Sequence, residues 1–302
     1  MPRKFPDSTP SDYSSRPPKA PEPAGDVSSF RPVIFGEALF DHFPDGSRVL
    51  GGAPFNVAWH LRGFGADPLL ITSVGQDPEG QEILERMGSW DMDTSGVQVH
   101  PTKQTGRVTA HLKDGQPTFE IEADQAFDGI TPQDLPAPSS PSLLYFGSLC
   151  LREEASASTL AHLRETLDEA APRAPTLVDV NLRAPWWERD GVRRHIRGVD
   201  WLKVNDEEVG LLTGRPVTNE TQILEAAQAL KSELAITNVL VTLGSQGAVA
   251  LTEGEPVRVE GLKLPEIVDT VGAGDAFTSV LALGINGRWP PEILLRRASA
   301  FA

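Results

Sequence analysis

The second half of the chain alternates between short apolar segments and longer amphipathic ones, and this alternation restricts the possible folds most strongly. The apolar segments are 143–147, 176–180, 201–204 and 239–243. In the amphipathic segments apolar residues recur with the spacing of a helix, which predicts helices at about 153–171, 186–197, 205–213 and 220–234. Apolar runs without polar alternation indicate strands that are buried on both faces. We therefore predict a three-layer α/β/α fold around a mostly parallel sheet.

The first half contains the same kinds of element and, in addition, an antiparallel patch. The predicted elements are a strand at 32–41, a glycine turn and helix at 51–65, a strand at 69–74 and a helix at 78–87. Three alternating segments at 97–99, 106–112 and 118–122 surround the dipeptide Asp114-Gly115, which favours a hairpin turn. We predict that these three segments form an antiparallel sheet.

The composition divides the chain into a tail and one domain. Residues 1–30 contain seven prolines between Pro2 and Pro23 and are expected to be a disordered tail, because they cannot bury enough surface to offset ordering. Residues 31–302 are long enough for one large domain, and 39% of the whole chain is hydrophobic. The chain has one cysteine, Cys150, and no apolar leader at its start, so we expect a cytoplasmic protein.

The formal net charge of −15 argues against nucleic acid and against an anionic membrane as partners. It does not argue against a nucleotide, because a local group of backbone amides and a metal ion can bind phosphates on an acidic protein.

A glycine turn at 269–277, with the sequence DTVGAGDAF, follows an apolar run and precedes helical spacing. Gly272 and Gly274 permit a tight turn, and the amides from Ala273 onward would open a helix, where unpaired N–H groups bind anions. Asp275 could accept a proton from a hydroxyl while these amides stabilise a transferring phosphoryl group. The alternative is that Asp275 only complements the helix dipole.

Two common phosphate-binding motifs are absent from the sequence. No GxxxxGK[ST] occurs, and the third glycine of a GxGxxG pattern would fall on Phe277. The missing glycines therefore argue against an oxidoreductase that binds a dinucleotide cofactor.

The stretch DTVGAGDAF resembles the second signature of the PfkB (ribokinase-like) carbohydrate kinases. An independent stretch, GGAPFNVA at 51–58 followed by Gly65, resembles the N-terminal signature of that family. The resemblance covers about residues 32–302 and implies transfer of the γ-phosphate of ATP to a sugar hydroxyl. It also implies that the antiparallel patch, within about 97–122, is a small β lid that covers the sugar.

The resemblance assigns Asp41, Gly51, Gly52 and Asn56 to the sugar. Asp41 would also lie beyond the carboxyl end of its predicted strand, where α/β sheets bind ligands. Asn56 alone could equally make a hydrogen bond at the start of its helix. Arg183 lies in a D-x-N-x-R stretch and could bind the substrate, or form a structural pair with an aspartate.

The nucleotide site is implied by further matches. These comprise Asn205 of an N-x-x-E element, and Thr242, Gly244 and Gly247 of a T-x-G-x-x-G turn. Glu208 would organise Mg²⁺ through water, because that ion keeps several waters and shares substrate phosphates. Asp269 matches a monovalent-cation position and suggests dependence on K⁺. The turn and the acidic helix start are weak motifs without the family match.

The stretch GEALFD at 36–41 is typical of fructokinase-like members, so fructose is the expected substrate. Kinases of 2-keto-3-deoxygluconate or of nucleosides remain alternatives, as does an inactive ligand-binding homologue. The family often forms homodimers through the lid. The chain stops at Ala302, where family members usually continue along the adenine pocket, so a short C-terminus is expected.

Overall fold

The computed structural model describes residues 27–113, 116–133, 135–136, 140–169, 173–262 and 271–302. The described chain starts inside the predicted tail, where Val27–Ser29 forms a 3₁₀ helix, η1, and Phe30 is completely buried. The described structure therefore begins a few residues before the predicted boundary at residue 31. No helix within these ranges is long and apolar enough to span a bilayer.

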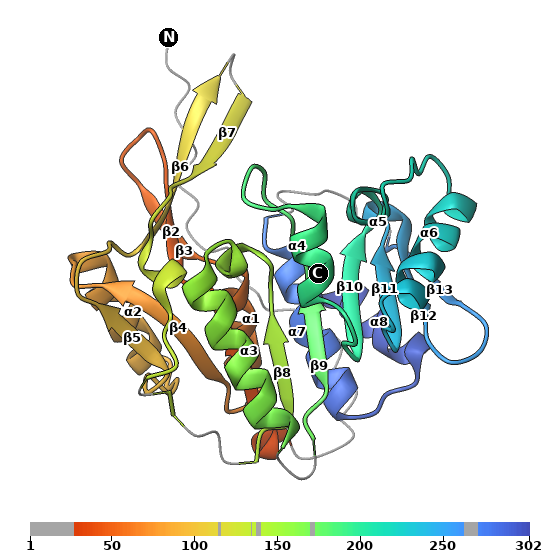
Figure 1. Cartoon of the computed structure of the whole chain (residues 1–302), viewed down its shortest axis with the longest axis horizontal. Helices are drawn as coiled ribbons and strands as arrows, with labels where there is room; N and C mark the ends of the chain where they lie inside the picture. Colours follow the sequence, from red (N-terminus) through yellow and green to blue (C-terminus); the bar gives the residue numbers. More distant parts are fainter. Residues whose placement is uncertain (1–26, 114–115, 134, 137–139, 170–172, 263–270) are drawn as a thin grey trace, which may run out of the picture.

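Nine described strands form the large sheet, with the order β13-β12-β11-β10-β9-β8-β1-β4-β5 (Figure 1). Their bounds are β1 Pro32–Phe35, β4 Leu69–Gly75, β5 Val97–His100, β8 Leu143–Phe146, β9 Thr176–Asp179, β10 Trp201–Asn205, β11 Asn238–Thr242, β12 Gly247–Leu251 and β13 Val257–Glu260. All neighbouring pairs from β11 to β5 are parallel, whereas β11–β12 and β12–β13 are antiparallel. The predicted mostly parallel sheet is confirmed.

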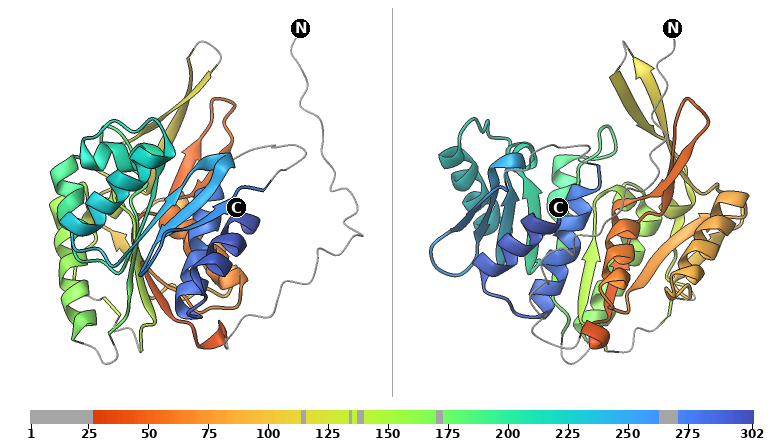
Figure 2. Two further views of the ribbon diagram at one scale, coloured as in Figure 1. Left: turned by 90° about the vertical axis from the view of Figure 1, so that its right-hand side faces the viewer. Right: turned by 180° about the vertical axis from the view of Figure 1, so that it is seen from behind.

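Helices cover both faces of this sheet (Figure 2, left). One face carries α3 Glu154–Asp168, α4 Arg189–His195, α5 Asp206–Thr213 and α6 Glu220–Glu233. The other face carries α1 Ala53–Gly63, α2 Pro78–Ser89, α7 Ala273–Asn286 and α8 Pro291–Phe301. The two faces correspond to two hydrophobic clusters, because successive strand residues point to opposite sides. The three-layer α/β/α prediction is confirmed.

The predicted strand at 32–41 was wrong as a single element. It is divided into β1 of the large sheet and β2, Leu39–His42, of a second sheet. The division occurs at Gly36, whose φ of 153° favours glycine, and a side chain there would collide with the ring of Pro54. Continuous burial from Pro32 to Phe40 concealed this break, since both parts are apolar.

The second sheet is the lid, with the order β3-β2-β6-β7, in which β3 is Arg48–Gly51, β6 is Gly106–Lys113 and β7 is Gln116–Ile121. The hairpin of β6 and β7 was predicted, and Figure 1 shows it rising from the body of the molecule. The third predicted lid segment, 97–99, was wrong: it lies in β5 and pairs in parallel with β4 at the edge of the large sheet. Short alternating segments do not distinguish an edge strand from a lid strand.

A buried ion pair fastens the lid to the body. Arg152 donates to both carboxylate oxygens of Asp128 at 2.7 Å, and these two side chains are 3% and 0% exposed. The same guanidinium donates to the carbonyl of Glu122, directly after β7. Removing one partner would leave an unpaired charge in the interior.

We predict that Asp128→Ala lowers the free energy of unfolding by about 3–5 kcal/mol, the usual cost of breaking a buried pair. Urea denaturation followed by circular dichroism measures this change. Glu292→Gln is the control, because the Arg296–Glu292 pair is mostly exposed and should contribute less than about 1 kcal/mol. Equal losses in the two variants would contradict the assigned role of the buried pair.

Candidate active site

The strand order identifies where a ligand site should lie. From β1 the chain first builds outward to β4 and β5, and then returns to place β8 on the other side of β1. Ligands of open α/β sheets bind beyond the carboxyl ends of the strands at such a switch point. The starts of helices α1 and α7, which pack together, meet close to this point.

A hydrogen bond joins the two predicted motifs. The Nδ2 of Asn56 donates to the Oδ2 of Asp275 at 2.7 Å, across 219 residues of sequence. Each residue lies in the first turn of its helix, α1 or α7. The amide of Asn56 therefore does not cap its own helix, and the carboxylate of Asp275 accepts no helical N–H. The geometry thus favours the site roles over the two structural alternatives.

The glycine turn delivers α7 with an open N-terminus. Gly272 is the N-cap residue and has the left-handed φ of 80°, which only glycine adopts without strain. Ala273, Gly274 and Asp275 are the first three helical residues, whose amides have no partner within the helix. Gly274 is exposed, so this end of the helix is open to a ligand. The predicted turn and helix start are confirmed.

Burial raises the pKa of Asp275 to about 6, and the negative charge of Asp179 adds to this rise. The hydrogen bond from Asn56 and the positive charges of Lys203 and Arg183 oppose it. A carboxylate with a pKa just below neutrality is mostly ionised at pH 7 and remains a stronger base than an ordinary aspartate. These properties suit a proton acceptor.

Glu37 is an acidic group that the sequence analysis did not assign. It is only 4% exposed, and its Oε2 has no hydrogen-bond partner among the described residues. Burial raises its pKa to about 7, with a further contribution from the charge of Asp275. The sequence does contain a signal for this group, because Glu37 is an acidic residue within the otherwise apolar run 32–40. The sequence analysis used it only as part of the stretch GEALFD.

The predicted sugar-binding residues lie around this pair of carboxyl groups. Asp41 is half-buried on lid strand β2, and its Oδ2 is 3.4 Å from the place where a Cβ on Gly51 would lie. Gly52 follows directly as the N-cap residue of α1. Burial raises the pKa of Asp41, while the positive charge of Arg183 opposes that rise. The structure therefore brings these residues to one region.

Arg183 lies in the segment between β9 and α4, and its residue is exposed. Its positive charge acts to lower the pKa values of Asp41, Glu37 and Asp275, so all three carboxyl groups lie within electrostatic range of the guanidinium. No ion pair of Arg183 occurs within the described residues, which disfavours the predicted alternative of a structural pair with an aspartate. A negatively charged ligand group could approach this side chain.

The predicted nucleotide-binding residues lie at the same edge of the sheet. Asn205 ends β10 and is paired with Thr242 at the end of the parallel strand β11. Gly244 begins the short 3₁₀ helix η4, Gly244–Gln246, and Gly247 begins β12. Parallel strands place their carboxyl ends together, so this turn and the start of α5 face the same side as α7.

Glu208 has a more structural setting than predicted. Its two carboxylate oxygens accept the amides of Asn205 and Leu182, each at 2.8 Å, and the residue is 7% exposed. The side chain of Asn205 accepts the amide of Glu208, which completes a capping box. The described residues contain no group of three or more His, Cys, Asp or Glu suited to a metal. The predicted cation residue Asp269 lies outside the described residues.

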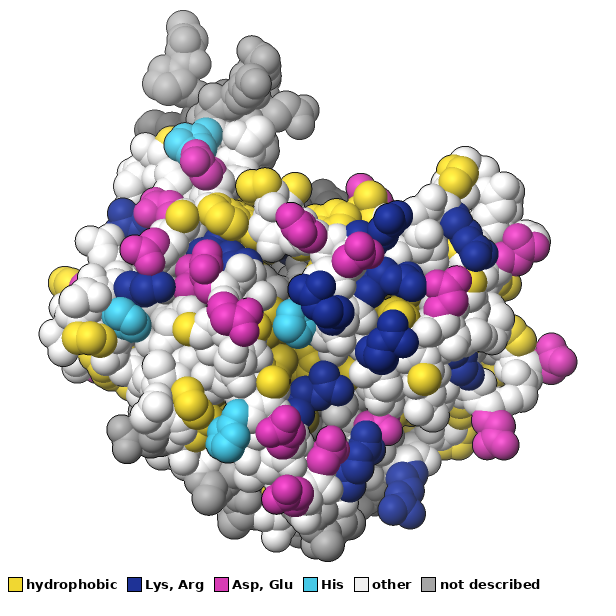
Figure 3. Space-filling view, in the orientation of Figure 1, with side chains coloured by type: hydrophobic (Ala, Val, Ile, Leu, Met, Phe, Trp, Pro, Cys, Tyr) yellow, Lys and Arg dark blue, Asp and Glu magenta, His cyan; other side chains and the backbone are white. Residues whose placement is uncertain are grey.

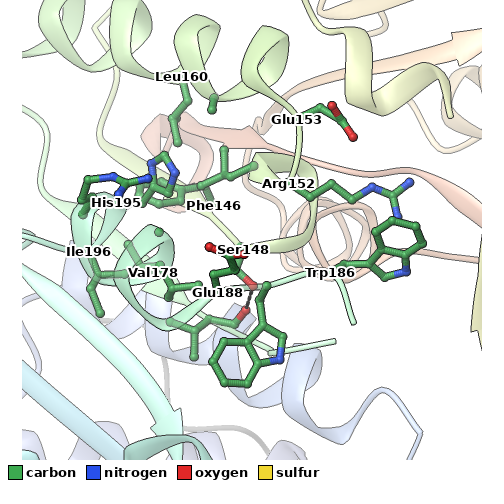
Figure 4. Close-up of a pocket in the computed structure, with 18 of the residues that line it drawn as sticks. Phe146, Ser148, Arg152, Glu153, Leu160, Val178, Trp186, Glu188, His195 and Ile196 are labelled. Atoms are coloured by element: carbon green, nitrogen blue, oxygen red, sulfur yellow. Dashed lines mark hydrogen bonds between the residues drawn. The ribbon is translucent and has the colours of Figure 1, made fainter. Parts of the chain in front are cut away.

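A large cavity lies apart from these residues. It has a volume of about 760 Å³ and lies between α3, α4 and the segment after β9, lined by groups that include Leu160, Trp186 and His195 (Figure 4). Basic side chains gather over α4 on this face of the molecule (Figure 3). None of the predicted site residues lines it.

The family model described as pfkB family carbohydrate kinase matches residues 30–302. The chain belongs to this kinase family. The resemblance predicted from two short signatures is therefore confirmed, and the match extends over the whole described domain.

Relatives of this kinase include the fructokinase of Klebsiella pneumoniae, 29% identical over 280 residues that cover 89% of each chain. A putative sugar kinase of Pyrococcus horikoshii is 30% identical over 82% of this chain and 74% of its own length. Its structure in complex with ATP has a TM-score of 0.74, with 26% identity over 90% of each chain.

The fructokinase of Vibrio cholerae O395 was solved with fructose, ADP and calcium ion bound. It matches this kinase with a TM-score of 0.77 and 25% identity, covering 91% of this chain and 90% of the other. Similar kinases therefore bind a sugar, an adenine nucleotide and a metal ion.

The raised pKa values generate a prediction for pH dependence. Asp275 can accept a proton only when ionised, so kcat/KM should rise with pH as Asp275 titrates, near pH 6. Glu37→Gln removes the second buried carboxyl group and leaves Asp275 in place, so this variant should retain both activity at pH 8 and an acid limb near pH 6. A limb near pH 4 in either protein would contradict the assigned environments.

Proposed function

We propose that this protein is an ATP-dependent sugar kinase that transfers the γ-phosphate of ATP to a hydroxyl of fructose. The Asn56–Asp275 hydrogen bond beside the open start of α7 carries the proposal, because it combines a proton acceptor, a sugar-binding amide and an anion site. The fructokinase names and bound ligands of similar kinases support fructose as the acceptor.

The reaction needs a deprotonated hydroxyl in line with the terminal phosphate. Asp41, Gly52 and Asn56 would hold the sugar so that one of its hydroxyls reaches the carboxylate of Asp275. This hydroxyl would either displace the Nδ2 of Asn56 from that carboxylate or bind beside it. That carboxylate accepts the hydroxyl proton as the oxygen attacks phosphorus and the bond to ADP breaks. The amides of residues 273–275 stabilise the charge on the transferring group.

Arg183 would add a second positively charged contact to the same reaction centre. Its charge acts on three carboxyl groups of the site and its residue is exposed, so it could bind the sugar or a phosphate oxygen through two N–H groups. On the nucleotide side, Asn205, Thr242, Gly244 and Gly247 would contact the remaining phosphates of ATP.

Mg²⁺ would be held mainly by the phosphates of ATP, because this ion keeps several waters and usually binds through substrate phosphates and one or two carboxylates. Bound there, it would reduce the negative charge on the phosphates. Glu208 would act by fixing α5 through its two backbone hydrogen bonds, and a contact with a metal-bound water is open to its remaining lone pairs. K⁺ near Asp269 remains a prediction.

Homodimer formation through the lid and a cytoplasmic location also remain predictions. The register of the lid strands places Val49 and Phe119, 55% and 53% exposed, on the same face as Asp41. This apolar face could close over a sugar or contact a second copy of the chain.

We predict that Asp275→Asn lowers kcat by at least about 100-fold, because the amide cannot accept the hydroxyl proton. Its oxygen can still accept the hydrogen bond from Asn56, so folding should be preserved. Glu154→Gln, at the first turn of α3 on the opposite face, should change kcat by less than about twofold. A loss of less than tenfold for Asp275→Asn would contradict its role as the base.

An ADP-release assay with Mg²⁺, with and without K⁺, tests the substrate. Fructose should give the highest kcat/KM in a panel that includes 2-keto-3-deoxygluconate and adenosine. A preference for either other compound would assign the corresponding alternative within the same reaction type. If no acceptor gives faster ADP release than the same assay without an acceptor, the inactive ligand-binding homologue would be favoured.

A further inference from the structure

A buried ion pair lies directly below the glycine turn and outside the proposed reaction centre. Lys203 of β10 and Asp179 of β9 are partners in the strand register, and Nζ lies 2.5 Å from Oδ2. The two residues are only 6% and 2% exposed, so both are shielded from solvent. Burying two charges is costly and often stabilises a fold no better than apolar residues would. The position of this pair therefore requires an explanation.

The pair is connected to the first turn of α7 through a single hydroxyl. The Oγ1 of Thr278 donates to the Oδ2 of Asp179 at 2.9 Å and lies 2.8 Å from the carbonyl oxygen of Gly274. The ammonium of Lys203 lies 3.8 Å from the place where a Cβ on Gly274 would lie. A shift of Asp179 or Lys203 would therefore be transmitted to the turn that carries the open amides.

The pair also determines the charge that faces Asp275. Asp179 raises the pKa of Asp275 and Lys203 lowers it, so the two charges of the pair act on that carboxylate in opposite directions. Three further groups face the same region: Arg183 from the β9–α4 segment, Glu37 from the β1–β2 segment and the buried Tyr145 of β8. Loss of the lysine alone would leave Asp275 next to an uncompensated carboxylate.

We propose that Asp179, Lys203 and Thr278 are positioning residues that hold the first turn of α7 in the geometry needed for phosphoryl transfer. They act through α7 and do not touch the reactants. This inference rests on the proposed kinase function for its catalytic consequence, while its structural part concerns the helix start alone.

The double variant Asp179→Asn/Lys203→Met separates positioning from simple stability. Neutral replacement of both partners should leave the urea midpoint nearly unchanged, since such replacements are often neutral. The turnover number kcat should still fall at least about tenfold with a much smaller change in the KM of the sugar, because misplacement of about 1 Å costs up to about 100-fold. A stable double variant with kcat within about twofold of the wild type would overturn the proposal.

The control is Arg193→Met/Glu233→Gln, which neutralises an ion pair between α4 and α6 on the opposite face of the sheet from α7. This variant should retain kcat and the acid limb of the pH profile. Thr278→Val removes the link without changing any charge, and Ser279→Ala removes a neighbouring hydroxyl that bonds only within the helix. Only Thr278→Val is expected to lower kcat.

Hydrogen exchange tests the helix start without any turnover. In the full-length protein, amides of a peptide covering residues 271–279 should exchange faster in Asp179→Asn/Lys203→Met and in Thr278→Val than in the two controls. Unchanged exchange would overturn the proposal even if the wild type is an active kinase. If no acceptor is phosphorylated by the wild type, the proposed function fails, and the exchange experiment still decides whether the pair holds α7.

Discussion

The hydrogen bond between Asn56 and Asp275 is the contact on which the rest of the site depends. It joins the first turns of two helices through residues that lie 219 positions apart in the sequence. It therefore forms only when α1 and α7 are both correctly packed on the sheet. Neither the Asn56 side chain nor the Asp275 side chain accepts a hydrogen bond from the backbone amides of its own helix start. The start of α7, where Gly274 is exposed, therefore remains open to a ligand, and the sheet positions it at the switch point beside β1.

Burial is what makes this contact chemically useful. An exposed aspartate would be a weak base, whereas the environment raises the pKa of Asp275 to about 6 and that of Glu37 to about 7. The surrounding positive charges of Arg183 and Lys203 keep this rise moderate. The site thus combines several buried carboxyl groups with nearby positive charges, which suits a reaction that depends mostly on positioning and charge.

Much of the fold was predictable because continuous apolar strands and amphipathic helices alternate after residue 143, and each pattern follows from burial. The two signatures also identified Asn56 and Asp275. Local patterns could not show that Gly36 divides one apolar run between two sheets, or that 97–100 joins the large sheet. Local patterns also could not show whether Glu208 accepts backbone hydrogen bonds or binds a metal, since both roles favour an acidic residue at a helix start.

A crystal structure with fructose, ADP and aluminium fluoride, a mimic of the transferring phosphoryl group, would test the central claim most directly. The account predicts that fluorine atoms accept hydrogen bonds from the amides of residues 273–275. It also predicts that a carboxylate oxygen of Asp275 lies within about 2.6–3.2 Å of the fructose hydroxyl that faces aluminium. Aluminium fluoride bound away from α7, or Asp275 out of reach of every sugar hydroxyl, would contradict the account.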